Sequence, residues 1–392
     1  MLHTATAYAI AAITSLAVIA SPGLGDAPTD PSPSPAGASR TAAAPAPAQR
    51  VHDRAGRSCG PEPTTAAGWQ RLFDAQTGAW SGGDGASSTR LPDGRLLWLF
   101  SDTFVGGVHP DGSRATGTRL VRNSILVTDG DCVAVSPTAT DAFPGHAQTW
   151  LWPTHAVVSA AGRPGGATTL VVFAQRVVRT GSGAFDFRRA GAVTVTVAVP
   201  WRGEPVVGAV RDLPASAVLW GAAVVTAGRT TWIYGTRATS RPLVFGRDLL
   251  LARAPTTTVS DPATWTYRTT SGWSPRAARA AVVRDAEDGV STVPSALQVG
   301  RSFVIVTKPQ EFLDDRVVAL TSTTPWGPWT TRELASARST ESVPRYSPVV
   351  VAARSARTRA FVVAVSQTAT TLQRIMADSS VTRPRFLDAR LG

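Results

Sequence analysis

One two-strand unit recurs five times along the chain, and this recurrence restricts the possible folds more than any other feature of the sequence. Each copy has a strand of small or apolar residues, a polar turn, and a strongly apolar second strand that ends at a polar residue. The copies start 54 to 72 residues apart, which is enough chain for a four-stranded antiparallel sheet in each repeat. They occupy residues 83–104, 154–176, 219–237, 291–310 and 345–367.

The sequence between these units is also typical of β-structure, because short runs of β-branched and aromatic residues alternate with Gly, Pro, Asn and Asp. Residues 123–128, 192–199 and 317–322 are predicted third strands. We therefore predict an all-β protein with the fold of a five-bladed β-propeller. The alternative is a β-sandwich, or two, because the same density of strands permits it.

The first 50 residues differ in composition from the rest. Residues 7–20 are apolar over the length of a signal-peptide core, and small residues suitable for cleavage follow them. Three parts are predicted: a signal peptide at 1–27, a Pro/Ala-rich disordered linker at 28–50, and the propeller domain at 51–392. The mature protein would then be secreted, monomeric and free of stable membrane insertion. An uncleaved membrane anchor is the alternative.

Cysteine count and charge limit the class of protein further. The chain has two cysteines, Cys59 and Cys132, and an even number in an exported protein favours a disulfide. A catalytic thiol is the alternative, but the sequence has no accompanying Cys-His pattern. The formal net charge is +12, yet the arginines are dispersed and no basic block or nucleic-acid-binding motif is present. We therefore expect no nucleic-acid partner.

The hairpin turns predict which polar residues face each other. In an antiparallel hairpin the numbers of opposed residues add to a constant that the turn sets. For the first hairpin, which turns at Asp93, that constant is about 186, so Asp84 is predicted opposite Asp102. The same rule places His155 beside Gln175, Trp220 beside Tyr234 or Thr236, Thr292 beside Lys308, and Tyr346 beside Ser366.

These pairs have the composition of a carbohydrate site. In a propeller all five hairpin ends surround the mouth of the central channel, where aromatic faces cover sugar C–H surfaces and polar groups select hydroxyls. Two opposed aspartates would not ionise together, so their pKa values would separate and provide one acid and one base. Glycoside cleavage needs such a pair. The structural alternative is that aspartate is common in turns and at strand ends.

A resemblance to a known family is carried by Trp80 to Ser88, Leu91 to Arg95, Leu97 to Phe104 and Arg122 to Ile125. These runs resemble the opening blade of secreted bacterial five-bladed propellers known as domains of unknown function, which are related to endo-D-arabinanases and other furanoside-cleaving hydrolases. Residues 322–329 resemble the blade-closing motif of arabinan-type propeller hydrolases. Ser101 departs from the glycine that is common at this position in such families.

The resemblance implies roles for individual residues. Asp84 would be the general base or nucleophile and Asp102 its acidic partner. Related furanosidases carry a third acid, for which Glu311 is the first candidate, with Glu287 and Asp285 as alternatives in a nearby loop. The candidate substrate-binding residues are Arg122, Asn123, His155, Gln175, Trp220, Tyr234, Lys308 and Tyr346.

The sequence therefore predicts a secreted glycoside hydrolase that cleaves a furanoside-containing polysaccharide such as arabinan or arabinogalactan. A non-catalytic propeller that binds glycan or protein is the first alternative. A lyase or sialidase-like enzyme is a weaker one, because no Asp-box turn is present. No cofactor is expected: the histidines form no transition-metal pattern, although a calcium ion held by oxygen ligands in the channel is compatible with the sequence.

Overall fold

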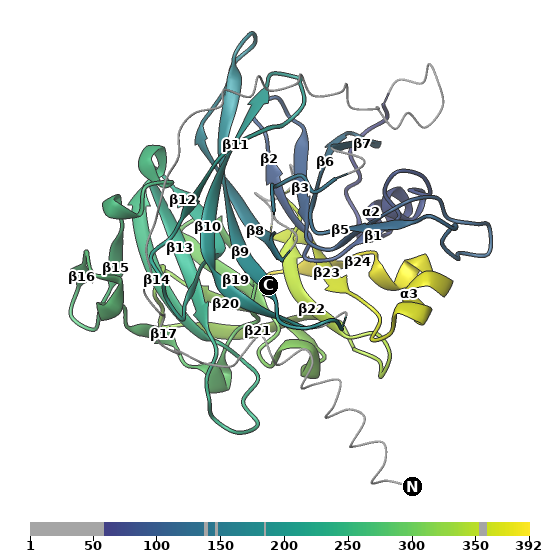
Figure 1. Cartoon of the computed structure of the whole chain (residues 1–392). Helices are drawn as coiled ribbons and strands as arrows, with labels where there is room; N and C mark the ends of the chain where they lie inside the picture. The colour runs from purple at the N-terminus through teal and green to yellow at the C-terminus, as the bar shows by residue number, and fades with distance from the viewer. Residues whose placement is uncertain (1–58, 137–139, 146–147, 184–185, 353–358) are drawn as a thin grey trace, which may run out of the picture.

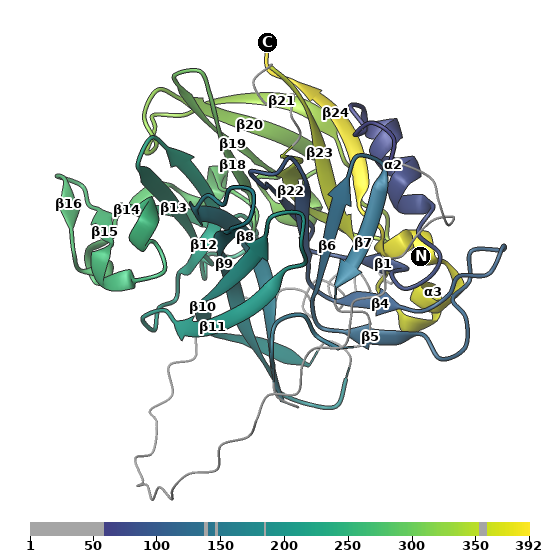
Figure 2. The same cartoon turned by 90° about the horizontal axis from the view of Figure 1, so that it is seen from above.

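Five antiparallel sheets stand around a common axis in the computed structural model, which describes residues 59–136, 140–145, 148–183, 186–352 and 359–392 (Figures 1 and 2). The innermost strands of the five sheets are β2, β8, β12, β18 and β22, and each contacts the next in this order. Strand β22 also contacts β2, which closes the ring. The predicted five-bladed β-propeller is therefore confirmed, and the sandwich alternative is excluded.

Each blade comes from one continuous stretch of chain, and its first two strands are one of the predicted hairpins. Blade 1 contains β2 (Ser87–Arg90), β3 (Leu96–Phe100), β6 (Ser124–Asp129) and β7 (Cys132–Ser136). Blade 2 contains β8 (Thr149–Ala160), β9 (Ala167–Arg179), β10 (Phe187–Pro200) and β11 (Val206–Asp212). Blade 3 contains β12 (Leu219–Ala227), β13 (Thr230–Arg237), β14 (Asp248–Pro255), β15 (Thr266–Arg268), β16 (Trp273–Ser274) and β17 (Val282–Arg284).

The last two blades complete the ring. Blade 4 contains β18 (Ser295–Val299), β19 (Ser302–Thr307), β20 (Arg316–Ser322) and β21 (Thr330–Ser336). Blade 5 contains β22 (Arg345–Val350), β23 (Ala360–Gln367) and β24 (Arg385–Arg390). A small additional sheet of β1 (Gly82–Gly83), β4 (Thr103–Val105) and β5 (Arg119–Val121) extends the first hairpin beyond blade 1.

The N-terminal helix α2 (Ala66–Asp74) helps to join blade 1 to blade 5. Its buried residues recur at helical spacing and include Trp69 and Phe73, whose rings pack against Trp98 of blade 1 and Phe386 of blade 5. The helix was not predicted from the sequence, because its apolar stripe covers only two turns. Burial of these aromatic rings stabilises the contact between the first and last blades.

The disulfide is confirmed: Cys59 and Cys132 are bonded, with Cα atoms 5.4 Å apart. It connects the segment before α2 to the outermost strand of blade 1, and it fits an extracytoplasmic location. The predicted signal peptide and linker lie outside the described residues. Within those residues, no helix combines the length and the apolar character needed to cross a membrane.

Two of the predicted pairings are confirmed. In the first hairpin, Gly83 pairs with Thr103 and Ser87 with Leu99, so the constant of 186 applies on both sides of Asp84. The amide of Asp84 donates to the carbonyl of Asp102 over 3.1 Å, which confirms that the two residues are opposed. Tyr346 pairs with Ser366, as predicted.

Three other pairings were wrong. Gln175 faces Trp152 rather than His155, and Trp220 faces Gly235 rather than Tyr234 or Thr236. In both hairpins a β-bulge adds a residue to one strand, which shifts every later pair relative to a count from the turn. Thr292 and Lys308 do not pair because β18 begins only at Ser295.

Candidate active site

A cavity of about 420 Å³ opens where the five blades meet, and every blade or a loop that extends from it contributes to the lining. The three predicted acids, Asp84, Asp102 and Glu311, all line it. Of the predicted substrate-binding residues, Arg122, Gln175 and Tyr346 also line it. The structure therefore brings together residues that lie more than 260 positions apart in the sequence.

Asp84 lies between β1 and β2, at the point where the first hairpin passes from the additional sheet into blade 1. Its Oδ2 accepts a hydrogen bond from the Tyr346 hydroxyl. Its Oδ1 is buried and has no hydrogen-bond partner among the residues that the structure describes. Burial and the nearby charge of Asp102 raise the pKa of Asp84 to about 7. This carboxyl group can therefore both give and take a proton near neutral pH.

Asp102 lies opposite Asp84 but has different partners. Its Oδ2 lies 3.0 Å from a terminal nitrogen of Arg122, and its Oδ1 accepts a hydrogen bond of 2.9 Å from the Trp152 indole. Burial raises the pKa of Asp102, whereas the charge of Arg122 and the bond from Trp152 act in the opposite direction. The guanidinium of Arg122 also lies 4.5 Å from the Trp150 ring centroid, which fixes its position. Both oxygens of Asp102 are therefore held by the protein.

Tyr346 connects the aspartate pair to blade 5. It lies on β22, and its hydroxyl donates to Asp84. Burial, followed by the charge of Asp84, raises the pKa of Tyr346 well above the usual value for tyrosine. The phenol therefore stays protonated and acts as a hydrogen-bond donor.

Glu311 starts the short 3₁₀ helix η6 (Glu311–Leu313) between β19 and β20 of blade 4 and is 7% exposed. Its Oε1 accepts hydrogen bonds from the backbone amide and the hydroxyl of Thr292, and it lies 3.6 Å from Nε of Arg247. The backbone of Glu311 has a φ of 55°, a left-handed conformation that is unfavourable for this residue type. A strained backbone that holds an acid at a cavity is typical of a functional site.

The other predicted substrate contacts do not line this cavity. Asn123 is buried, and its side-chain amide donates to the Leu151 carbonyl over 2.8 Å and accepts from the Phe143 amide over 2.6 Å. His155 is buried, and its Nε2 lies 2.8 Å from the Pro294 carbonyl. Burial lowers the pKa of His155 to about 4, so the ring is neutral at pH 7. Both residues connect blades or loops.

Trp220, Tyr234 and Lys308 also lie away from the cavity. Trp220 packs against Tyr267 in the core of blade 3, and the Tyr234 hydroxyl donates to the Pro325 carbonyl over 2.8 Å. The ammonium of Lys308 donates to two backbone carbonyls, over 2.9 and 2.7 Å, which connects blade 4 to the start of blade 5. Their residue types suit a carbohydrate site, but here Tyr234 and Lys308 bond to backbone carbonyls and Trp220 packs in the core.

Two residues that contact the acids were not predicted from the sequence. Trp152 donates to Asp102, and Arg247 lies beside Glu311. Trp152 could have been found because it faces Gln175, which was predicted at the site; the bulge in β8 hid this pairing. Arg247 belongs to a long loop between β13 and β14, and no sequence signal identifies it.

No group of three or more His, Cys, Asp or Glu side chains in the described part of the chain is arranged to hold a metal ion. The acids of the cavity are bonded instead to Tyr346, Arg122, Trp152 and Thr292.

The chain is similar to solved structures of low sequence identity, and one of these matches with a TM-score above 0.5. A hydrolase candidate from Bacteroides ovatus is 18% identical, with a TM-score of 0.65, and the match covers 82% of this chain and 88% of that one. An endo-1,4-β-xylanase from Bacteroides thetaiotaomicron is 11% identical, with a TM-score of 0.42 and coverages of 74% and 87%. A family 43 arabinoxylan arabinofuranohydrolase from Bacillus subtilis, solved with cellotetraose, is 10% identical, with a TM-score of 0.44 and coverages of 79% and 63%.

The comparison with curated proteins found no match. The sequence model of one family spans almost the whole propeller, from residue 67 to residue 389. This family is described as a domain of unknown function, DUF5005. The match includes the opening blade, on which the resemblance to such propellers was first seen, and the chain belongs to the DUF5005 family.

Proposed function

We propose that the protein is a glycoside hydrolase that cleaves a furanoside-containing polysaccharide such as arabinan or arabinogalactan. The observation that carries the proposal is the unequal bonding of two opposed aspartates in one cavity. Asp84 keeps an unbonded oxygen and a pKa near 7, whereas Arg122 and Trp152 hold both oxygens of Asp102. Separated pKa values of this kind allow carboxyl groups in one site to act as acid and base. The choice of a furanoside rests on the family resemblance.

In this proposal each carboxyl group has its own role. Asp84 exchanges a proton with the substrate, because a group whose pKa lies near the working pH does so most efficiently. Asp102 is held in place by Arg122 and Trp152, and its charge raises the pKa of Asp84. Glu311 supplies the second carboxyl group that glycoside cleavage requires, either to attack the anomeric carbon or to activate water. Tyr346 positions Asp84 through its hydroxyl.

The proposal also covers the cellular context of the reaction. The predicted signal peptide would export the chain, and the linker would separate the propeller from the membrane or the cell wall. The disulfide suits such a compartment. A secreted enzyme with this fold would act on polysaccharide outside the cytoplasm.

The test measures the release of reducing ends from arabinan, arabinogalactan and fructan. We expect the wild-type protein to cleave a furanoside polymer, and Asp84→Asn to lose about 10²- to 10⁴-fold in kcat, the usual contribution of acid–base catalysis. Glu311→Gln should lose activity to a similar extent. Asp212→Asn is the matched control, because Asp212 is exposed on blade 2, pairs with Arg176 and does not line the cavity.

Binding measurements separate the enzyme from its alternative. The affinity of Asp84→Asn for the cleaved polymer should stay within about threefold of the wild-type value, since the change keeps the shape of the side chain. Full activity in Asp84→Asn would show that the assignment of roles is wrong. A protein that binds glycan tightly but cleaves none of the polymers would instead be the non-catalytic binding propeller.

A further inference from the structure

The cavity has an apolar wall as well as acids. Its lining includes several phenylalanine and aliphatic side chains from separate parts of the fold: Phe104, Phe187, Val244, Phe245, Phe312 and Ile375. These residues come from β4, from the start of β10, from the loop between β13 and β14, from η6 and from α3 (Leu372–Ala377). The cavity therefore offers an extended hydrocarbon surface beside its polar groups.

Three leucines at this wall are exposed to solvent. Leu120 on β5 is 43% exposed, Leu243 in the β13–β14 loop is 88% exposed, and Leu372 at the start of α3 is 61% exposed. All three line the cavity. Leu120 extends from blade 1, Leu372 from blade 5 and Leu243 from blade 3. In the ring, blade 3 is not a neighbour of blade 1 or of blade 5. These three residues, called the apolar rim below, therefore reach the cavity from opposite sides.

Leu243 has no structural reason to be leucine. Its φ is 60°, and a bulky side chain is strained in this left-handed conformation. With 88% of its surface exposed, the side chain also adds little to the stability of the fold. An exposed, strained leucine at the edge of a cavity is best explained by contact with a ligand.

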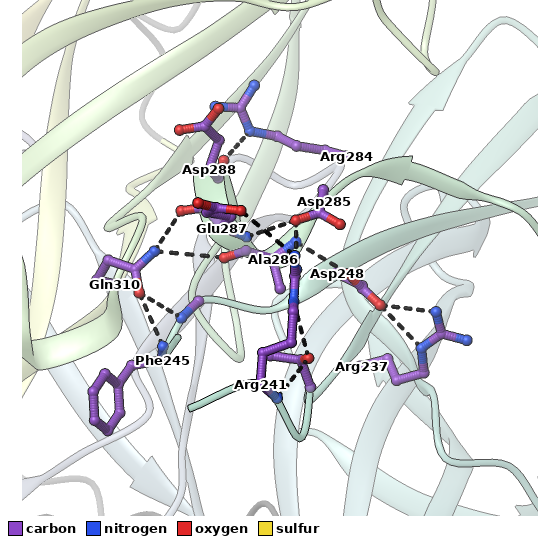
Figure 3. Close-up of polar contacts among 12 residues, drawn as sticks. Arg237, Arg241, Phe245, Asp248, Arg284, Asp285, Ala286, Glu287, Asp288 and Gln310 are labelled. Atoms are coloured by element: carbon purple, nitrogen blue, oxygen red, sulfur yellow. Dashed lines mark hydrogen bonds and ion pairs between the residues drawn. The ribbon is translucent and has the colours of Figure 1, made fainter. Parts of the chain in front are cut away.

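The loop that carries Leu243 is held firmly (Figure 3). The Gln310 side chain accepts hydrogen bonds of 2.9 and 3.1 Å from the amides of Phe245 and Gly246, and it donates to the Glu287 carbonyl over 2.6 Å. Arg241 pairs with Asp285 on the neighbouring loop. A Cβ at Gly246 would come within 2.3 Å of the Pro309 carbonyl oxygen, so the loop packs closely on the chain beneath it. Leu243 is therefore presented at a defined position.

The charges of the cavity do not favour an ionic ligand at this wall. Each arginine that lines the cavity is paired with a carboxylate: Arg122 with Asp102, Arg247 with Glu311, and Arg241 with Asp285. Recognition of an anionic substituent would require these pairs to break. An uncharged hydrocarbon group fits the exposed leucines without this loss.

We propose that the apolar rim binds a hydrocarbon group on the substrate, so that the substrate is a furanoside glycan that carries an alkyl or acyl substituent close to the acids. Cleavage of this substrate rests on the proposed function, whereas its binding does not. The sugar enters toward Asp84 and Glu311, and the hydrocarbon group lies between Leu243 on one side of the cavity and Leu120 and Leu372 on the other. Furanosides without this substituent would bind more weakly.

The test compares methyl and octyl arabinofuranosides of the same anomeric configuration, with calorimetric titration of the full chain below the micelle concentration of the octyl compound. We expect the octyl compound to bind at least tenfold more tightly to the wild-type protein. In Leu243→Asn the ratio should fall below about threefold. Asparagine tolerates the left-handed conformation, so this variant should fold normally while it lacks the hydrocarbon surface. Its thermal unfolding temperature serves as the check.

Two control variants make each outcome decisive. Val206→Asn removes a hydrophobic side chain that is 57% exposed on β11 and does not line the cavity, so it should keep the wild-type ratio. Asp84→Asn should also keep it, because binding of the chain needs no proton transfer. Equal binding of the two compounds by the wild-type protein, or an unchanged ratio in Leu243→Asn, would overturn the inference. If the ratio behaves as expected while no glycoside is cleaved, the proposed function alone fails.

Discussion

Asp84 in the cavity and the polar side chains that join the blades are bonded in opposite ways. Asn123, His155 and Lys308 are buried between blades or loops, and each bonds to backbone groups from distant parts of the chain. In the cavity, Asp84 keeps a buried oxygen without a partner among the described residues. Burial raises its pKa to about 7 instead of being balanced by hydrogen bonds.

This difference separates structural from functional residues in one molecule. A buried polar group that is fully bonded stabilises the fold, whereas a buried carboxyl oxygen without a partner destabilises it and marks a candidate for a functional role. Both the cavity and the contacts between blades contain residue types that are expected of a carbohydrate site. Their bonding, rather than their identity, distinguishes them, and four experiments test this comparison.

The largest effect is expected in the bonded group. Asn123→Ala should lower the free energy of unfolding by about 3 kcal/mol, because it removes buried hydrogen bonds and leaves the Phe143 amide and the Leu151 carbonyl without that partner. Urea unfolding followed by tryptophan fluorescence measures this change. A loss below about 1 kcal/mol would mean that water or a rearranged loop replaces these bonds.

The second experiment uses the pH dependence of Asp84. Its pKa in the folded protein is raised above the usual 3.8, so the folded state holds this proton more tightly than the unfolded state. The contribution of Asp84 to stability is therefore fully present below about pH 4 and is lost as the pH rises through 7. Asp84→Asn does not titrate, and its stability relative to the wild type should rise between pH 4 and pH 8, by on the order of 3 kcal/mol. Unfolding curves at several pH values show this trend or its absence.

His155 should show the opposite dependence. Burial lowers its pKa from 6.5 to about 4, so the unfolded state binds this proton more tightly. Its contribution to stability is present above about pH 6.5 and is lost as the pH falls through 4. Relative to the wild type, His155→Gln should therefore gain stability on acidification, by on the order of 2 kcal/mol. A parallel pH series that gives the same sign as Asp84→Asn contradicts the comparison.

The smallest effect concerns the charge of Asp102. Asp102→Asn removes the negative charge that raises the pKa of Asp84 and leaves Arg122 without its carboxylate partner. Both changes lower the pKa of Asp84, by about one unit. In a pH–rate profile, the residual hydrolytic activity should then fall on the alkaline side at a lower pH than in the wild type. An unshifted profile would mean that Asp84 does not control this fall.

The sequence was most informative where structure depends on nearby residues. The first hairpin turns at Asp93 without a bulge between its strands and Asp84, so counting from the turn placed Asp84 opposite Asp102. The five hairpins and the third strands β6, β10 and β20 were found for the same reason. Counting failed for His155 and Trp220 because a bulge leaves no clear mark in the sequence.

The candidate site could be predicted only in part. Glu311 was found because it follows a predicted strand end, and it shares the cavity with both aspartates. Lys308 lies three residues before it in the same segment, yet its ammonium bonds to the Ala337 and Arg345 carbonyls. The apolar rim was not anticipated, since Leu243 lies in a loop whose conformation depends on Gln310 and on the neighbouring loop that carries Asp285.

The amino-acid sequence by itself determined the number of blades and the facing of Asp84 and Asp102, because turns and alternating strands act over about twenty residues. It also determined the disulfide, because the chain has only two cysteines. The tertiary structure decided which polar side chains are satisfied and which remain available to a substrate. That outcome depends on backbone carbonyls from other blades, such as Pro294 for His155, 139 residues away. Such long-range partners come together only when the blades assemble into the ring, so the local sequence cannot predict them.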